Sequence, residues 1–377
     1  MESPKMPSLL QRWMGPHSMI LLPLIVAGLQ SASGLPDGED LHFPGEKHFG
    51  SIRRLTAGGE NAEGYFSWSG DQLVYQATFG EMECDQVFSL DLLTGARRRI
   101  STGTGRCTCA FWMPEDRGII FASTHGDNPN CPPAPDYSGG YVWKIYPGYD
   151  LWVRDFETGS LTSLAPAPGY DAEAVVSPDG QWIAFTSMRS GDLEVWIMKP
   201  DGTGLKQLTN GLGYDGGPFF SPDSSRIVYR SWHPKSETET ARYKTLLDQN
   251  SIEPMALQIR TMDLKGNQKV QVTNNEAANF APYFHPDGRR IIFSSNLADP
   301  KGRNFDLYLI GDDGKGLERV TTCPSFDGFP MFSRDAKRLV FASNRANAKP
   351  RDTNLFLAEW IEVPSAESTG LKSPVAD

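Results

Sequence analysis

The residues best suited to chemistry return at fixed positions beside six similar turn motifs. Six residues before each motif lie Asn61, Cys107, Asp171, Asp215, Asn279 and Asp327. A second polar set follows the motifs and comprises Gln76, His125, Arg189, His233, Asn296 and Arg345. Carboxylate and amide oxygens suit hard cations, and arginine pairs well with carboxylates. If folding brings these positions to one axis, they form a binding site that could hold Ca²⁺ or a basic peptide group.

A structural explanation for the same residues stays open. Asp and Asn at strand starts often accept backbone N–H bonds, and Arg can pair with a carboxylate of its own repeat. His125 and His233 lie in different repeats without metal-ligand spacing, so no metal site is predicted. With no GxSxG or HExxH motif, no catalytic residue is predicted either. The predicted ligand-binding set is Asp171, Asp215, Asp327, Asn279, Asn61, Arg189, Arg345, His125 and His233.

Five cysteines add a second kind of chemistry. They are Cys84, Cys107, Cys109, Cys131 and Cys323. We predict at least one disulfide involving Cys131 in an exported protein. Cys107 or Cys109 could be its partner, with Cys84 taking the other, and the sequence leaves the pairing open. Cys323 is then the odd thiol. A zinc site is the alternative, and a single CxC pair supports it poorly.

The elements that must position these residues form a sixfold repeat. Stretches beginning at 67, 113, 177, 221, 285 and 333 read SWSGDQLVY, MPEDRGIIF, SPDGQWIAF, SPDSSRIVY, HPDGRRIIF and SRDAKRLVF. Each places a turn before an apolar triplet, as expected for a tight turn between two strands. The spacings are 44 to 48 residues, apart from two of 64. This period is typical of four-stranded propeller blades, two of which carry insertions.

The fourth strands predict how the ring closes. Short segments such as KQLT and VQVT end the first five repeats, but none follows Trp360 in the sixth. A matching segment, Arg53-Arg54-Leu55-Thr56, precedes the first repeat. We therefore predict an all-β fold, a six-bladed β-propeller closed by an N-terminal strand completing the last blade. Residues 53–55 should pair near 355–357 and cover a sheet edge.

The repeat also resembles a known family. The SPDG turn, the third strand with [DN]-[LIV]-[YWF] and the closing Leu-Thr resemble the TolB-type, WD40-like β-propeller repeat over about residues 52 to 360. The resemblance implies a bacterial exported binding protein. TolB carries an additional N-terminal α/β domain, for which the short segment before the first repeat leaves no room.

The chain divides into four parts by composition. Residues 1–34 read as a signal peptide, 35–51 as a polar linker, 52–362 as the propeller and 363–377 as a disordered tail. Two insertions, at 126–148 and 232–256, fall between second and third strands and should lie on one face, here called the insertion face. The first should be an ordered loop. The second should contain a helix over 236–249, capped by Ser236 or Thr238, with Ala241, Leu246 and Leu247 packing inward.

Composition limits the function. The net charge of −10 argues against nucleic-acid binding, and no apolar run after the signal reaches membrane length. We predict a periplasmic or secreted monomer without a cofactor, a non-catalytic scaffold binding a protein or peptide of the cell envelope at the channel mouth. The alternative is a metal-assisted lyase or hydrolase acting on oligosaccharides at the same mouth.

Overall fold

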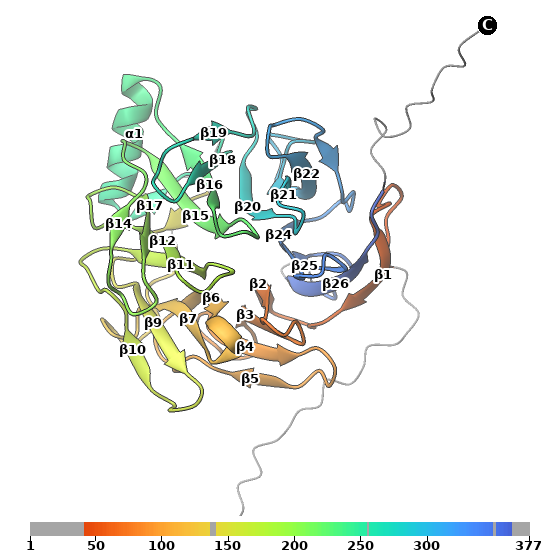
Figure 1. Cartoon of the computed structure of the whole chain (residues 1–377), viewed down its shortest axis with the longest axis horizontal. Coiled ribbons are helices and arrows are strands. Elements are labelled where there is room, and N and C mark those ends of the chain that lie inside the picture. Colours follow the sequence, from red (N-terminus) through yellow and green to blue (C-terminus); the bar gives the residue numbers. More distant parts are fainter. Residues whose placement is uncertain (1–40, 136–140, 255, 350–351, 364–377) are drawn as a thin grey trace, which may run out of the picture. The chain divides into compact units, whose positions relative to one another are not determined.

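The computed structural model describes residues 41–135, 141–254, 256–349 and 352–363. Within them, six four-stranded antiparallel sheets stand around a ring, which confirms the predicted six-bladed β-propeller (Figure 1). The predicted signal peptide (1–34) and almost all of the predicted tail (363–377) lie outside the described residues. Among the residues described, no helix has both the length and the apolar character needed to cross a bilayer.

Each blade runs from an inner strand at the channel to an outer strand. Blade one contains β2 (Glu60–Phe66), β3 (Gln72–Thr78), β4 (Gln86–Asp91) and β5 (Arg97–Arg99). Blade two contains β6 (Cys107–Trp112), the 3₁₀ turn η1 (Pro114–Asp116), β7 (Gly118–Ser123), β9 (Asp150–Asp155) and β10 (Leu161–Ser163). Blade three contains β11 (Asp171–Val176), β12 (Ile183–Ser187), β13 (Glu194–Met198) and β14 (Lys206–Gln207).

The second half of the ring repeats this order. Blade four contains β15 (Tyr214–Phe220), β16 (Arg226–Trp232), β18 (Gln258–Asp263) and β19 (Val270–Gln271). Blade five contains β20 (Asn279–Phe284), β21 (Arg290–Ser295), β22 (Asp306–Gly311) and β23 (Glu318–Arg319). Blade six contains β24 (Asp327–Phe332), β25 (Arg338–Ser343), β26 (Asn354–Trp360) and, from the other end of the chain, β1 (Phe49–Arg54).

The turn motif works through its first hydroxyl. In blade three, Ser177 Oγ donates to Asp179 Oδ1 (2.5 Å) and accepts from the Trp182 amide (3.0 Å), while the Gly180 amide closes the turn on the Ser177 carbonyl (2.8 Å). Gly180 has a φ of +70°, a conformation that glycine adopts without a Cβ penalty. The following apolar triplet then enters the core, where Ile183 and Phe185 have no exposed surface. Burial of each such side chain contributes roughly 1.5–3 kcal/mol.

The closing Thr of the repeat hydrogen-bonds to the third strand of its blade. Its hydroxyl accepts the backbone N–H of the third strand, as Thr209 does from Val195 (2.8 Å) and Thr321 does from Leu307 (2.8 Å). In blade six the same bond comes from the N-terminal segment, because Thr56 accepts from the Leu355 amide (2.9 Å). Thr56 thus occupies the repeat position that blade six itself lacks.

The N-terminal strand closes the ring as predicted. β1 pairs antiparallel with β26, joining Arg53 to Leu357 and Arg54 to Phe356 (Figure 1). The boundary of the expected linker differs, because β1 already begins at Phe49. Part of the expected linker also packs on the last blades, where His48 stacks on Trp360 at 4.6 Å and Glu46 pairs with Arg345 at 2.9 Å.

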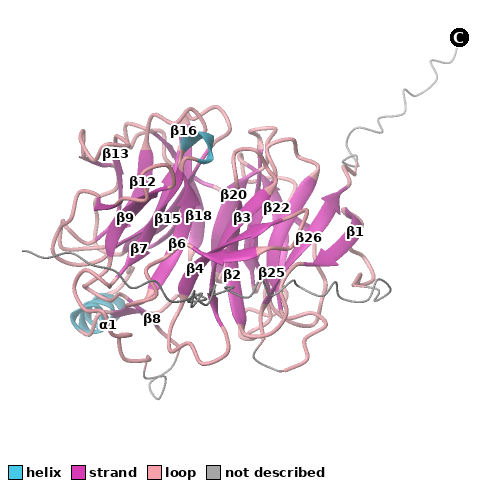
Figure 2. Ribbon diagram, turned by 90° about the horizontal axis from the view of Figure 1, so that it is seen from below, coloured by secondary structure: helices cyan, strands magenta, loops and turns pink. Residues whose placement is uncertain are grey.

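The two insertions meet, which confirms that they share one face. β8 (Trp143–Lys144) in the first pairs with β17 (Ser251–Ile252) in the second, and both lie with α1 (Glu237–Asp248) on one side of the ring (Figure 2). Ser236 caps α1 as predicted, since its hydroxyl accepts from the Glu239 amide. The helix buries Tyr243 and Leu246 and half-buries Leu247, whereas Ala241 is exposed. The expectation for Ala241 is therefore wrong, because the helix directs Tyr243 to the ring instead.

Candidate binding site at the channel mouth

The three predicted aspartates are buried, and each pairs with a side chain of its own blade. The pairs are Asp171–Arg189 (2.8 Å), Asp215–His233 (3.2 Å) and Asp327–Arg345 (3.0 Å). Burial raises the pKa of Asp171, and that of Asp327 to about 6, against the opposing effect of the arginines. The hydrogen bond that His233 donates to the Asp215 carboxylate raises the pKa of His233. These pairs connect the start of each inner strand to the end of the next strand, as the structural explanation expects.

The remaining predicted residues are also engaged within the blades. Asn61 donates to the Gly58 and Thr353 carbonyls, and Asn279 accepts from Ser295 Oγ at 2.8 Å. His125 hydrogen-bonds to Ser123 at 2.7 Å and packs on Trp152, and burial lowers its pKa. None of the nine predicted residues lines the large cavity of the described ring. The expected convergence of these side chains on the channel axis is therefore corrected: they are turned into the blades.

The side chains that do reach the channel lie two residues further along each inner strand. A β-bulge interrupts the pairing of every inner strand with its neighbour, for example between Ala172 and Val175 in blade three. The residue after the first bulged position has a positive φ, between +48° and +59°. These six residues are Glu63, Cys109, Glu173, Gly217, Ala281 and Phe329, and all six line the cavity.

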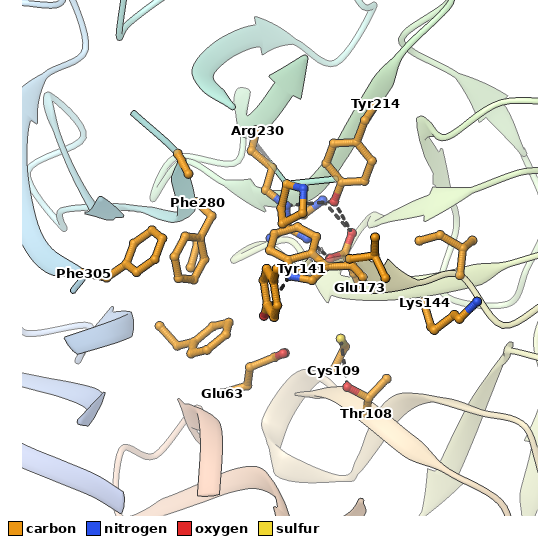
Figure 3. Close-up of a pocket in the computed structure, with 18 of the residues that line it drawn as sticks. Glu63, Thr108, Cys109, Tyr141, Lys144, Glu173, Tyr214, Arg230, Phe280 and Phe305 are labelled. Carbon is orange, nitrogen blue, oxygen red and sulfur yellow. Dashed lines mark hydrogen bonds and ion pairs between the residues drawn. The ribbon is translucent and has the colours of Figure 1, made fainter. Parts of the chain in front are cut away.

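This cavity lies at the channel mouth and has a volume of about 940 Å³. Its walls are rich in aromatic side chains from the blades, and the insertions contribute Trp143 and Lys144 of β8 and Glu253. Figure 3 shows Phe280 and Phe305 together on one side, with Glu173, Tyr214 and Arg230 on another. The volume is at the upper end of the usual range for ligand pockets, and apolar walls with few polar groups are typical of them.

Glu173 is held by a complete set of partners. It forms an ion pair with Arg230, accepts from Thr186 Oγ1 (2.6 Å) and from the Gly217 amide (2.8 Å), and lies 3.3 Å from the Tyr214 hydroxyl. Arg230 is further covered by the rings of Trp143 (4.9 Å) and Tyr214. The carboxylate of Glu173 raises the pKa of Arg230, although burial acts in the opposite direction. The pair is therefore a fixed, charge-neutral part of the wall.

Glu63 lacks such compensation. Its described partners are the Tyr65 hydroxyl, at 3.4 Å, and the Cys109 thiol, and no ion pair to a described cation is found. Burial, and then the charge of Glu173, raise the pKa of Glu63 to about 7. Burial and the charges of Glu63 and Glu173 raise the pKa of Cys109 well above its usual value, so this thiol stays protonated. Glu63 is consequently the group of the inner mouth that can gain most from a new partner.

Four phenylalanines form an apolar wall on blades five and six. Phe280 lies 5.1 Å from Phe305, 5.4 Å from Phe329 and 6.4 Å from Phe326, measured between ring centroids. We call this set the phenylalanine wall. The first two pairs are edge-to-face and the third is stacked, and both arrangements stabilise an aromatic cluster.

The cysteines form one disulfide in the described structure, Cys84–Cys131. This confirms that Cys131 is bonded, but its partner is Cys84, whereas Cys107, Cys109 and Cys323 are free thiols. The expected Cys131 pairing with Cys107 or Cys109 is therefore wrong. The reason is topological, because Cys107 is fully buried at the start of β6 and Cys109 points into the channel, while Cys84 lies in the β3–β4 loop.

The described residues contain no group of three or more His, Cys, Asp or Glu side chains arranged to hold a metal ion. Each of the three aspartates considered for Ca²⁺ has an arginine or histidine partner in its own blade.

The fold and the cavity define a six-bladed propeller with a ligand-sized pocket at its channel mouth, and comparison with known proteins identifies the propeller as TolB-like. A TolB structure from Agrobacterium tumefaciens has a TM-score of 0.51 at 16% identity and covers 81% of this chain and 91% of that chain. TolB from Acinetobacter baumannii also has a TM-score of 0.51, at 15% identity, covering 80% of this chain and 63% of that chain. At these identities the likeness shows the fold alone.

Sequence comparison adds a different class of relative. The uncharacterized peptidase YuxL of Bacillus subtilis (strain 168) is 26% identical over 182 residues, which is 43% of this chain and 27% of that protein. The match thus spans about a quarter of that curated relative. No protein-family model matches the chain. The similar proteins therefore include TolB structures, which share the fold, and an uncharacterized peptidase, which matches over part of its sequence.

Proposed function

We propose that this protein is an exported propeller that binds a peptide segment of a partner protein at its channel mouth, without catalysing a reaction. The observation that carries the proposal is the convergence of the six bulge residues and the phenylalanine wall on one cavity of about 940 Å³. The insertions extend the cavity wall with aromatic side chains, as a peptide groove requires. The TolB-like fold supports a binding role by analogy only, since one fold hosts many functions.

Export to the periplasm or the cell exterior is part of the proposal. Disulfides persist in oxidising compartments, and Cys84–Cys131 joins two loops of the mature ring. The partner is accordingly expected among envelope or secreted proteins, with the propeller acting as a monomer.

Site-specific photocrosslinking tests this function. A benzophenone amino acid replaces Phe305 at the mouth or, as a matched control, Phe156, which is 41% exposed in the β9–β10 turn on the opposite face. We expect a crosslinked partner from Phe305 alone in envelope extracts. Equal crosslinking at both positions, or none at Phe305, would contradict binding at the mouth.

A second candidate is acid–base cleavage of an oligosaccharide at the same mouth. Glu63, with a pKa of about 7, and Glu173, paired with Arg230, have the contrasting environments that a proton donor and its partner carboxylate need. Aromatic walls also suit sugar rings. Release of reducing or unsaturated ends from oligosaccharides, abolished by Glu63→Gln, would favour this function over binding alone.

A further inference from the structure

The inner mouth has two walls of opposite character. Blades five and six present the phenylalanine wall, whereas blades one to four present Glu63, Cys109, Glu173 and Arg230. Both walls begin at the bulge positions, since Glu63 and Phe329 occupy the same place in their blades. A ligand that fills the cavity must therefore contact a carboxylate and an aromatic surface at the same time.

The charges of the inner mouth do not balance. Arg230 forms its ion pair with Glu173, which leaves Glu63 without an ion pair among the described residues, although the charge of Arg230 partly offsets the effect of burial on Glu63. At the rim, Asp85 pairs with Arg106, and Glu253 pairs with Arg242. An uncompensated carboxylate in a half-buried site is costly, and an incoming cation that hydrogen-bonds to it removes that cost.

The charged side chains at the rim of the cavity affect where a basic ligand group can bind. Lys301 and Arg303 line the cavity next to Phe305, and the exposed Glu276 lines it as well, so the charges at this side of the cavity are mixed. Among the carboxylates that line the cavity, Glu63 is a half-buried one without an ion pair in the described part of the chain, so a basic ligand group gains most against Glu63, in the blade next to blade six. A neighbouring apolar side chain then falls towards the phenylalanine wall.

We infer that the bound peptide carries a lysine or arginine that pairs with Glu63, next to an aromatic or large aliphatic residue that packs on the phenylalanine wall. This inference rests on the proposed function and names its ligand class. Pairing stabilises the carboxylate form of Glu63, so binding near neutral pH releases a proton from the protein.

Selection from a random heptapeptide phage library tests the inference on the full mature chain. The wild type is compared with Glu63→Gln, with Phe329→Ala and with Glu157→Gln, a control in which an exposed carboxylate of the opposite face is neutralised. Thermal unfolding verifies that each variant is folded. Enriched peptides are then synthesised in two forms, one with arginine at the basic position and one with citrulline, which keeps the shape of arginine without its charge.

We expect enriched peptides to contain a basic residue beside an apolar one. Citrulline should weaken binding to the wild type and to Glu157→Gln at least tenfold, and to Glu63→Gln less than twofold. Phe329→Ala should weaken both peptide forms. Calorimetry in two buffers of different ionisation enthalpy should show proton release with the wild type that Glu63→Gln abolishes.

The contrary outcomes separate the two claims. If Phe329→Ala weakens peptide affinity but neither citrulline nor Glu63→Gln changes it, the inference is overturned and binding at the mouth remains supported. If neither variant changes the affinity of the enriched peptides, or if no peptide is enriched, the inference and the proposed function are both overturned.

Discussion

A single backbone conformation in each blade decides which side chain reaches the channel. The bulge turns the third residue of the inner-strand motif to a positive φ and aims its side chain at the axis, while the first residue stays inside the blade. Blade by blade, this position holds an acid, a thiol, an acid, glycine, alanine and phenylalanine. The scaffold thus keeps its geometry while one position per blade sets the chemistry of the mouth.

Glu63 should make stability depend on pH. Its pKa is raised from 4.5 to about 7, so between these values the folded protein keeps a proton that the unfolded chain has released. The free energy of unfolding therefore falls as pH rises through this window, and the full cost is present above pH 7. Glu63→Gln removes this cost, and we expect it to stabilise the protein by roughly 2 kcal/mol at pH 8, allowing for partial exposure, and by little at pH 4.5.

Urea unfolding from pH 4.5 to 8 measures this effect, with Glu157→Gln as the exposed control. If the free energies of unfolding of Glu63→Gln and the wild type differ by the same amount at every pH, the assigned environment of Glu63 is wrong. Burial also raises the pKa of Glu194 to about 7. Glu194 therefore makes the free energy of unfolding fall with rising pH in every variant, in the same direction as Glu63.

The buried aspartates should instead affect stability alone. Asp327 is fully buried and shares Arg345 with Glu46, at 3.0 and 2.9 Å. Asp327→Asn keeps the shape but weakens a charge-assisted pair, so we expect a loss of about 1–3 kcal/mol. Peptide affinity at the mouth should remain unchanged. Unaltered unfolding together with lost affinity would return Asp327 to the binding site that the sequence suggested.

At the scale of elements, the insertions form a small shared structure. Ser251 of β17 pairs with Lys144 of β8, and the Tyr243 hydroxyl of α1 donates to Asp192 at 2.5 Å. On the other side, Cys131 ties the first insertion to the β3–β4 loop through Cys84. Because β8 carries Trp143 over Arg230, the position of the cavity wall depends on these attachments.

Removing the disulfide should loosen this wall. The Cys84→Ser, Cys131→Ser double variant opens a loop of sequence separation 47, and we expect a loss of about 2–4 kcal/mol, less if the insertion unfolds independently. Limited proteolysis should cut first within 126–135. Cys323→Ser, which removes a free buried thiol, serves as the control. Equal protease resistance of the double variant and wild type would show that β8 is held by its β17 pairing alone.

Much of the fold could be predicted because it depends on repeated local chemistry. The Ser177 turn, the apolar triplets and the closing Thr209 each recur at fixed offsets, so the strands assigned in one repeat can be assigned in the others. The candidate site could not be predicted to the residue. Strand alternation alone does not reveal a bulge, and the bulge transfers the channel position from Asp171 to Glu173. Inspection of the residue two positions after Asn61 and after Asp327 would have found Glu63 and Phe329.

At the scale of the molecule, the ring depends on one non-local sheet. β1 and β26 lie at opposite ends of the chain, and His48 hydrogen-bonds both to Glu318 of blade five and to the Ile361 carbonyl. The closing sheet therefore joins the last two blades as well as the chain ends. Without it, β26 would present a long apolar edge that invites aggregation.

Thr56 gives a direct test of closure. Its hydroxyl accepts from the Leu355 amide as Thr209 accepts from Val195 within an uninterrupted blade, at 2.9 and 2.8 Å. Valine at either position keeps the shape but leaves a buried N–H without its acceptor, so Thr56→Val and Thr209→Val should each cost about 1–3 kcal/mol. Equilibrium unfolding in urea measures both.

Deletion of residues 41–57 extends the same argument to the whole strand. It removes the β1–β26 pairing, the Glu46–Arg345 ion pair and the His48–Trp360 stack together, so the loss should far exceed that of Thr56→Val and lower the melting temperature strongly. A synthetic peptide of residues 41–57 should restore part of the loss in proportion to its concentration, because it binds only the folded ring. If the truncated protein has the melting temperature of the wild type, blade six is stable with three strands and closure by β1 does not hold the ring.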